Sequence, residues 1–456
     1  MLSVLRNRTY RHLFTAQVVA LVGTGLATVA LSLLAYDLAG GNASAVLGTA
    51  LAIKMTAYVA IAPVVGAVAD RIPRRALMAA MDLTRAAVAL ALPFVTEIWQ
   101  VYILVLLLQA ASAAFTPTFQ ATIPEVLPAE RDYTQALSMS RLAYDLESLF
   151  SPALAAALLT VVSYTWLFAG TTVGFLASAA LVVSAVLPKP RPVERGGGVR
   201  DRAAFGTRLF LATPRLRALL ALDLAVAAAG AIVFVDTVGV VRDHFHRPAG
   251  AVSLALGAYG AGSMLAALLL PRLLRRSGDR AVMLPAAFAL PAVLAGVAAV
   301  TATAPGGWAW PALLAAWAAI GAACSGVLTP GGRVIRRSAA DPDLPAAFAA
   351  QFSLSHSCWL LTYPLAGWLA AGLGLPATAA VLGLVALAAA VTAAVVWPAR
   401  DPARVEHVHA DLPPGHPHLA GAHAGGGGWR HGHTFVIDSH HRSWPTGRQH
   451  RGAAHG

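Results

Sequence analysis

Long apolar segments alternate with short polar turns along most of this chain. The turns hold most of the arginines and acids, whereas the segments between them are almost uncharged. An α-helix needs about 20 apolar residues to cross the hydrocarbon core of a bilayer. The pattern therefore predicts twelve membrane-spanning helices, over about 13–39, 44–69, 75–94, 101–123, 134–162, 165–187, 217–241, 250–271, 281–303, 308–330, 344–373 and 375–397.

A polar, basic linker divides these spans into two groups of six. It is rich in proline, glycine and arginine, and it separates two hydrophobic halves. The halves resemble copies of each other, because Thr116-Pro117 and Ser151-Pro152 have counterparts at nearly the same separation in the second half, Thr329-Pro330 and Tyr363-Pro364. Chance spacing of prolines in alanine-rich helices is the alternative. The predicted organisation is a first six-helix half (1–188), a linker (189–214), a second half (215–398) and a tail (399–456).

Composition places the chain in the membrane class. Of 456 residues, 57% are hydrophobic and 12% charged, and the mean hydropathy is +0.66. A soluble domain carries roughly a quarter charged residues. The formal charge of +12 comes from arginines in alternate turns, which is the positive-inside pattern and not a nucleic-acid surface. We therefore expect an all-α integral protein of the inner (plasma) membrane with both termini in the cytoplasm, embedded in lipid and monomeric.

One charged turn carries a recognisable motif. Gly66-Ala-Val-Ala-Asp70-Arg71-Ile-Pro-Arg74-Arg75 lies between the second and third predicted spans, and it resembles the signature loop of the major facilitator superfamily. That resemblance implies transport by alternating access, with Asp70 acting as a latch that contacts helix 11 in the outward-facing state. A cluster that only fixes the topology is the plainer interpretation. The second-half copy, Arg272–Arg280, keeps its arginines and lacks the acid at the matching place.

Within the superfamily, residues 8–93 and the stretch from Pro117 to Ser151-Pro152 are similar to the twelve-span drug:proton antiporters. That branch includes macrolide and siderophore exporters and nickel-resistance proteins. Ser151-Pro152 stands where these antiporters usually carry Gly-Pro in helix 5. The resemblance implies export driven by a proton gradient, with no bound cofactor.

Ionisable side chains inside predicted spans need an explanation, since each costs about 2.5–3.5 kcal/mol on insertion scales. Arg141 and Asp145 are four residues apart and share a helix face, so an ion pair within the helix is the simple account. Glu147 faces elsewhere and is a candidate proton carrier. Asp223 and Asp236 fall near opposite ends of one span, where solvation at the membrane interface explains them most simply.

Four further polar residues lie within spans. Lys54 could pair with Asp37 or extend to the interface, and Asp82 and Arg85 are spaced to pair with each other. His356 is a candidate for proton or cation handling, or a core histidine with satisfied hydrogen bonds. Cys358, two residues further on, points to another face of the helix and cannot share an ion with it.

The tail is polar, rich in glycine and proline, and contains eleven of the fifteen histidines. Imidazoles favour Ni²⁺, Co²⁺ and Zn²⁺, so a metal-capturing tail is one hypothesis and a disordered tail with a biased composition is the other. The candidate ligands are His407, His409, His416, His418, His431, His433, His440 and His441.

No nucleotide-binding loop or catalytic triad occurs in the sequence, so we predict a transporter and not an enzyme. The first hypothesis is a secondary-active, proton-coupled exporter of drug-like or other toxic small solutes. The alternatives are a transition-metal (Ni/Co/Zn) exporter with a metal-capturing tail, and a membrane-bound metal sensor or buffer in which the tail is the working part. Uptake instead of export stays open, and the substrate is not specified.

Overall fold

The computed structural model describes most of the chain. The described ranges are 2–39, 43–68, 72–187, 199–248, 250–304 and 306–399, and in the tail 404–409, 412–413, 416–419, 421–425, 428–437, 441 and 444. Helices dominate the body, and the strands are confined to the tail. The statements below concern these residues.

The first half consists of six long helices that follow a short 3-10 turn at Leu2–Arg6. They are α1 (Arg8–Ala39), α2 (Ala43–Val68), α3 (Arg74–Ala91), α4 (Ile98–Val126), α5 (Glu130–Leu159) and α6 (Tyr164–Ser184). The helix continues past the expected end of the fourth span at residue 123, because Pro117 and Pro124 both lie inside α4. Pro128, two residues beyond the last residue of α4, is the proline that stops the helix.

The second half begins after α7 (Val199–Ala212), a helix inside the segment expected to be a linker. It comprises α8 (Pro214–Gly239), α9 (Gly250–Leu273), α10 (Asp279–Ala302), α11 (Ala309–Arg336) and α12 (Leu344–Val396). The continuous α12 contains one non-helical residue, Gly374, with φ 80° and ψ 169°. That break divides α12 into the two expected spans, 344–373 and 375–397, so the second half also has six spans.

Nine of the described helices are long and apolar enough to cross a membrane. They include α12, which supplies two spans, and they do not include α2 or α5. In α2 the described apolar stretch is shorter, Ile53–Val65, and α5 carries several charged residues. With these two helices the bundle has twelve spans arranged as two six-helix halves.

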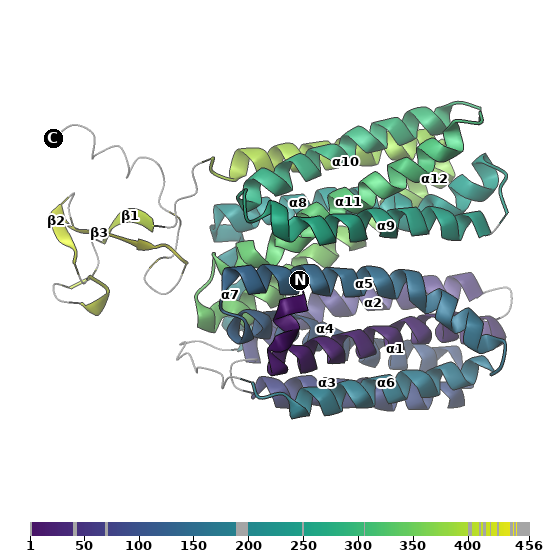
Figure 1. The fold of residues 1–456 in the computed structure, drawn as a ribbon, viewed down its shortest axis with the longest axis horizontal. Coiled ribbons are helices and arrows are strands. Elements are labelled where there is room, and N and C mark those ends of the chain that lie inside the picture. The colour runs from purple at the N-terminus through teal and green to yellow at the C-terminus, as the bar shows by residue number, and fades with distance from the viewer. Residues whose placement is uncertain are drawn as a thin grey trace.

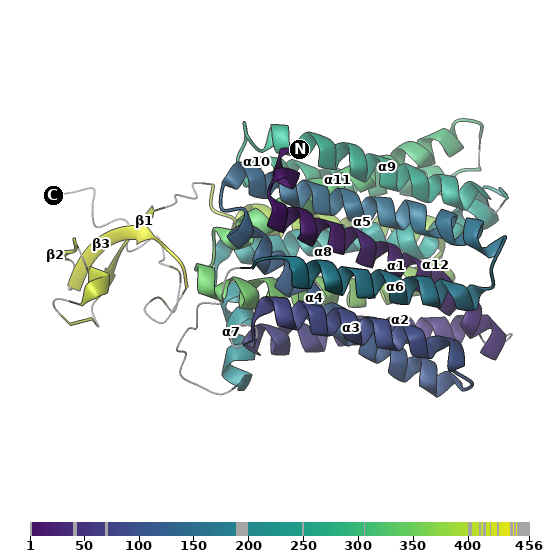
Figure 2. The same cartoon turned by 60° about the horizontal axis from the view of Figure 1, so that its bottom comes forward.

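The two halves lie side by side with their helices nearly parallel to one long direction (Figure 1). Both views place the start of α1, the end of α12 and the tail strands at the same end, which we call the terminal end (Figure 2). The helix α7 also lies there, and Gly206 of α7 approaches Ala346 at the start of α12 closely. The linker therefore contacts the second half through a helix.

Small residues bring helices together within each half. In the second half the Cα of Gly262 on α9 faces the Ala318 carbonyl of α11, and Gly321 on α11 faces the Tyr259 carbonyl in return. In the first half the Thr171 hydroxyl of α6 donates a 2.9 Å hydrogen bond to the Gly23 carbonyl of α1. Close backbone approach of this kind stabilises helix contacts in lipid, where apolar burial supplies little driving force.

The described part of the tail contains a small antiparallel sheet, in a segment where the sequence predicts flexible chain. Its order is β1-β3-β2, with β1 at Arg404–His409, β2 at His423–Gly425 and β3 at Gly428–Thr434. Val405, Phe435 and Ile437 belong to the same buried apolar cluster as the core of the second half. The sheet therefore has an apolar anchor, and Val405, His407 and His409 share one of its faces because they alternate along β1.

Candidate transport cavity

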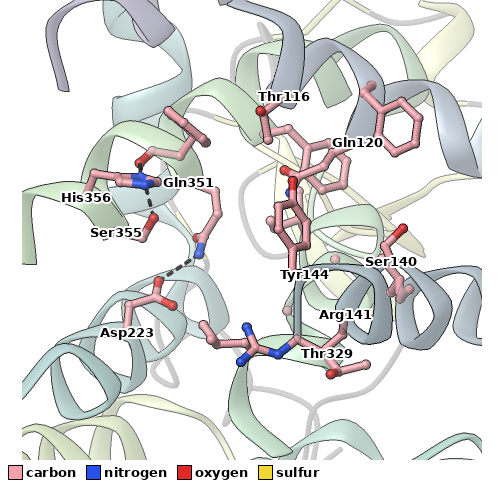
Figure 3. Close-up of a pocket in the computed structure, with 18 of the residues that line it drawn as sticks. Thr116, Gln120, Ser140, Arg141, Tyr144, Asp223, Thr329, Gln351, Ser355 and His356 are labelled. Atoms are coloured by element: carbon pink, nitrogen blue, oxygen red, sulfur yellow. Dashed lines mark hydrogen bonds between the residues drawn. The ribbon is translucent and has the colours of Figure 1, made fainter. Parts of the chain in front are cut away.

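A cavity of about 420 Å³ lies between the two halves. Helices α1, α2, α4 and α5 line it from the first half, and α8, α11 and α12 line it from the second. Figure 3 shows polar side chains pointing into it from both sides. The labelled ones are Thr116, Gln120, Ser140, Arg141, Tyr144, Asp223, Thr329, Gln351, Ser355 and His356.

Asp223 of α8 lines this cavity, whereas the sequence alone favours solvation at the membrane interface as its explanation. It is nine residues beyond the start of α8, which corresponds to about 13 Å along the helix axis. Its side chain is buried, and its Oδ2 accepts a 2.8 Å hydrogen bond from Gln351 Nε2 (Figure 3). Its Oδ1 is buried and has no hydrogen-bond partner among the described residues. A buried carboxylate oxygen in this situation is costly unless a ligand or a proton satisfies it.

Arg141 is the other charged side chain of the cavity, and it forms the expected pair with Asp145. Its Nη2 lies 3.0 Å from Asp145 Oδ1, one turn further along α5. Ser263 of α9 joins this pair across the two halves: its hydroxyl receives hydrogen bonds from Arg141 and donates one of 2.8 Å to Asp145 Oδ2. The guanidinium charge is thus balanced within the protein.

Aromatic rings line the side of the cavity formed by α2 and α12. Tyr58 packs edge-on against His356 with 4.7 Å between ring centroids, and Phe352 lies 4.2 Å from the same imidazole. The Nδ1 of His356 is 2.7 Å from the Phe352 carbonyl, which can only accept, so Nδ1 carries the proton. Trp359 completes this wall. His356 therefore lines the cavity with one nitrogen already committed to the backbone.

The remaining candidate carboxylates are not among the residues that line this cavity. Glu147 interacts electrostatically with Lys54, whose ammonium lies 5.7 Å from the centre of the Tyr58 ring. Lys54 thus faces Glu147, and Asp37 interacts instead with Tyr164.

Asp236 lines a separate pocket near the other end of α8, together with Asp243 and His244. Asp82 pairs with Arg85 as the spacing predicted, and it also accepts a 2.7 Å hydrogen bond from Ser178.

The signature loop is described only in part. Asp70 and Arg71 lie outside the described residues, and Gly66 is described by its helical backbone alone. Arg74, the first residue of α3, forms a 2.6 Å ion pair with Glu125 of α4, and Arg75 donates to the Val183 carbonyl of α6. These arginines connect helices of the first half.

In the helix 5 motif Ser151 is buried against Gly25 of α1, whereas the Pro152 ring lies outside the described part.

A charged clasp joins the halves at the terminal end. Arg333 at the end of α11 forms ion pairs with Glu130 of α5 at 2.6 Å and with Asp279 of α10 at 2.8 Å. It also donates a 2.7 Å hydrogen bond to Thr134, and Arg336 donates one of 2.7 Å to the Pro128 carbonyl. The positive-inside pattern of the sequence predicts only a topological role for the arginines of this turn. Its partners identify it as a connection between the halves.

Six of the tail histidines converge around the sheet. Two overlapping groups place one ring nitrogen from each member within 4.8 Å of the others: His407, His418, His431 and His433, and His407, His409, His418 and His441. Burial, and to a smaller extent the neighbouring imidazoles, lowers the pKa of His407 and of His418 to about 4, so these rings are neutral at neutral pH. His416 belongs to neither group, and His440 lies outside the described residues.

Sequence reasoning missed the uncharged polar residues of the cavity. Gln17, Gln120 and Gln351 come from three different helices and meet there. A glutamine within an apolar run is a usable signal, because an unsatisfied amide is expensive in hydrocarbon. The partner of each one depends on how the helices pack.

Two six-helix halves around a central polar cavity define a multi-pass membrane transporter. The family model for the Major Facilitator Superfamily matches residues 13–240 and 220–432. The chain belongs to the major facilitator superfamily, as the signature loop predicted.

Individual relatives are distant. An uncharacterized MFS-type transporter of Bacillus subtilis (strain 168), YfiS, is 24% identical over 220 residues, which is 47% of this chain and about half, 52%, of that protein. The human organic anion transporter MFSD10 (TETRAN) has a TM-score of 0.69 at 13% identity, covering 85% of this chain and 99% of that structure. A bacterial homologue of the iron transporter ferroportin, in an outward-facing state, has a TM-score of 0.69 at 13% identity, covering 85% and 98%. These structures share the fold with this chain.

Proposed function

We propose that this protein is a secondary-active, proton-coupled exporter of amphiphilic organic cations. The observation that carries the proposal is the Asp223 carboxylate, which is buried in the cavity with one oxygen lacking a partner among the described residues. An ionisable residue at such a depth in a membrane protein marks a substrate or proton pathway. The transporter class follows from the family, and the substrate and the coupling are our proposal.

The charge balance of the cavity favours a cation. Arg141 is neutralised by Asp145 at 3.0 Å, whereas the hydrogen bond from Gln351 brings no charge to Asp223. The cavity therefore carries a net negative charge when Asp223 is ionised. Tyr58, Tyr144 and Trp359 offer aromatic faces around it, and such faces attract organic cations by about 0.5–2 kcal/mol each.

A single carboxylate that binds either a proton or a cation supplies antiport. Protonation of Asp223 removes the charge that holds the substrate, and binding of the cation excludes the proton, so the two ligands compete for one group. Rocking of the halves then exposes that group to each side in turn. Glu147 beside Lys54 is the second candidate for the proton, and the polar groups around Arg141, Asp145 and Ser263 connect the halves during the motion.

We assign the terminal end to the cytoplasm. Most of the described arginines of the turns gather at this end, among them Arg75, Arg276 and Arg337, and basic residues stay on the cytoplasmic side. Closure of this end by the Arg333 clasp then corresponds to a state in which the cytoplasmic entrance is shut. On this assignment the tail also lies in the cytoplasm.

Transition-metal export is the second candidate, and its support lies in the tail. In the cavity Asp223 and His356 are the available ligands, and the described residues show groups of three or more metal-binding side chains only among the tail histidines. A dedicated transition-metal site in the cavity would need further nitrogen or sulfur ligands. A membrane-bound metal sensor, in which the tail alone works, is the remaining alternative.

The test uses purified protein in liposomes with an imposed pH gradient and tetraphenylphosphonium as the probe cation. We expect gradient-driven probe movement that Asp223→Asn reduces at least tenfold. Asp236→Asn is the matched control, because it changes the same residue type on the same helix outside the cavity, and it should leave transport within about twofold. Equal loss in both variants, or no effect of Asp223→Asn, contradicts the proposal. Movement of Ni²⁺ or Zn²⁺ without movement of the organic probe favours the metal alternative.

A further inference from the structure

The histidines of the tail form a compact cluster that the transport cavity does not use. His407 and His409 come from β1, His431 and His433 from β3, His418 from the short 3-10 helix Pro417–Leu419, and His441 from the segment after the sheet. His407 and His431 are direct partners in the β1–β3 register. The fold thus gathers residues separated by up to 34 positions around one point.

The ring nitrogens are spaced like the ligands of one metal ion. The His407 Nε2 lies 3.0 Å from His409 Nε2 and 2.9 Å from His441 Nε2, and the last is 3.3 Å from His418 Nε2. Four nitrogens at about 2.0–2.1 Å from a tetrahedral zinc ion are about 3.3 Å apart. The group is therefore close to the geometry that a bound ion requires.

The hydrogen bond at the other side of His407 fixes its tautomer. Its Nδ1 lies 3.1 Å from the Val405 carbonyl oxygen, which can only accept, so Nδ1 carries the proton. The Nε2 atom then carries a lone pair, and this lone pair is directed at two other imidazole nitrogens. A backbone carbonyl that orients a metal-binding histidine in this way is the usual outer-shell arrangement. Lone pairs that face one another are unfavourable unless protons or a cation lie between them.

An apolar and aromatic shell encloses one side of the cluster. The Phe435 ring is 4.9 Å from His407 and 4.5 Å from His441, and Trp444 lies 5.0 Å from Phe435. His431, the cross-strand partner of His407, is also buried, and its Nε2 has no hydrogen-bond partner among the described residues. This buried nitrogen is a second observation that points to a ligand.

We propose that the tail binds one borderline divalent transition-metal ion, of the Zn²⁺, Co²⁺ or Ni²⁺ class, through imidazoles that include His407 and His418. These two residues belong to both overlapping groups, so one ion can be held by either His431 and His433 or His409 and His441 as the remaining pair. Imidazole ligands suit these ions, whereas Mg²⁺ and Ca²⁺ prefer oxygen. The proposal is independent of what the cavity transports.

The test measures binding of Co²⁺ and Zn²⁺ to the full-length protein in detergent, by calorimetry and by the visible absorption of Co²⁺. We expect one tightly bound equivalent and the intense spectrum of a four-coordinate cobalt site. His418→Ala is the informative variant, since it removes a shared ligand that lies outside the strands. The substitution should weaken metal binding by at least about 100-fold, because the loss of an outer-shell partner alone lowers metal affinity 10- to 100-fold.

His416→Ala is the matched control, two residues away in the same segment and in neither group, and His423→Ala on β2 is a second control. Both should bind Co²⁺ as the unaltered chain does. Equal weakening in all three variants, several weak equivalents, or the pale spectrum of six-coordinate Co²⁺ overturns the proposal. Transport of the organic probe by His418→Ala shows separately whether the cavity works, so failure of the metal site and failure of the transport proposal are distinguishable.

Discussion

Arg74 and Asp279 are the first residues of corresponding helices in the two halves, and each forms an ion pair with the helix that follows its own. Arg74 of α3 pairs with Glu125 near the end of α4, and Asp279 of α10 pairs with Arg333 near the end of α11. Both halves therefore have an ion pair between the start of one helix and the end of the next, but the acid and the base have exchanged places. An acid at a helix start and a base at a helix end are favoured by the helix dipoles, so the second-half arrangement is the better supported one. The second signature loop lacks an acid at the position that matches Asp70, and Asp279 lies four residues beyond that position.

The clasp around Arg333 predicts how the terminal end opens. Glu130→Gln removes one exposed ion pair, which is worth about 0.2–1 kcal/mol, so the ratio of closed to open molecules should fall about 1.4- to 5-fold. Arg333→Ala also removes the contacts with Thr134 and Asp279 and should have the larger effect. The measurement is the rate at which an impermeant thiol reagent, added at the terminal end, modifies a cysteine introduced at Leu137 in the cavity wall.

Arg131→Gln, which changes a charge on the same turn of α5, is the control for this experiment. It should leave the labelling rate unchanged, and the two native cysteines are buried, so the chain without the introduced cysteine gives the background. The clasp has no gating role if Arg333→Ala labels no faster than Arg131→Gln.

The Arg141–Asp145 pair predicts strong non-additivity. Asp145→Asn or Arg141→Gln alone leaves the other charge buried without its ion-pair partner, and breaking a buried pair costs about 3–5 kcal/mol. The double variant removes both charges and should recover most of the lost thermal stability, measured as Tm in detergent. Additive losses in the double-variant cycle would mean that the two residues contribute separately, which the 3.0 Å contact argues against.

Gly262 and Gly257 on α9 predict opposite effects of one substitution. A Cβ at Gly262 would collide with the Ala318 carbonyl of α11, so Gly262→Ala should destabilise by about 1–3 kcal/mol. A Cβ at Gly257 meets nothing within 4 Å, so Gly257→Ala should be neutral or stabilise the helix by up to about 1 kcal/mol. Comparing the Tm of the two variants checks this. Similar losses in both would refute the close approach of α9 and α11.

Gly374 and Gly372 provide the same comparison at the break in α12. Gly374 has φ 80° and ψ 169°, a conformation that is essentially confined to glycine, so Gly374→Ala should cost about 1–3 kcal/mol. Gly372 is helical with open space around it, and alanine should be tolerated there. Thermal unfolding of both variants is the measurement. If Gly374→Ala unfolds at the same temperature as Gly372→Ala, α12 does not need this break.

The sequence by itself determined the spans, the two halves and the break between the last two spans at residue 374. It also predicted the Arg141–Asp145 and Asp82–Arg85 pairs. These features are local: the insertion cost of a charge, the spacing of a helical turn and the conformational freedom of glycine all act within a few residues.

The tertiary structure decided which distant groups meet. Asp223 and Gln351 are 128 residues apart, and Arg333 reaches Glu130 over 203 positions. Nothing in either local segment specifies these partners, because they depend on how the second half packs against itself and against the first. The histidine cluster follows the same rule: the sequence supplied the residues, and the register of β1 against β3 brought their nitrogens together.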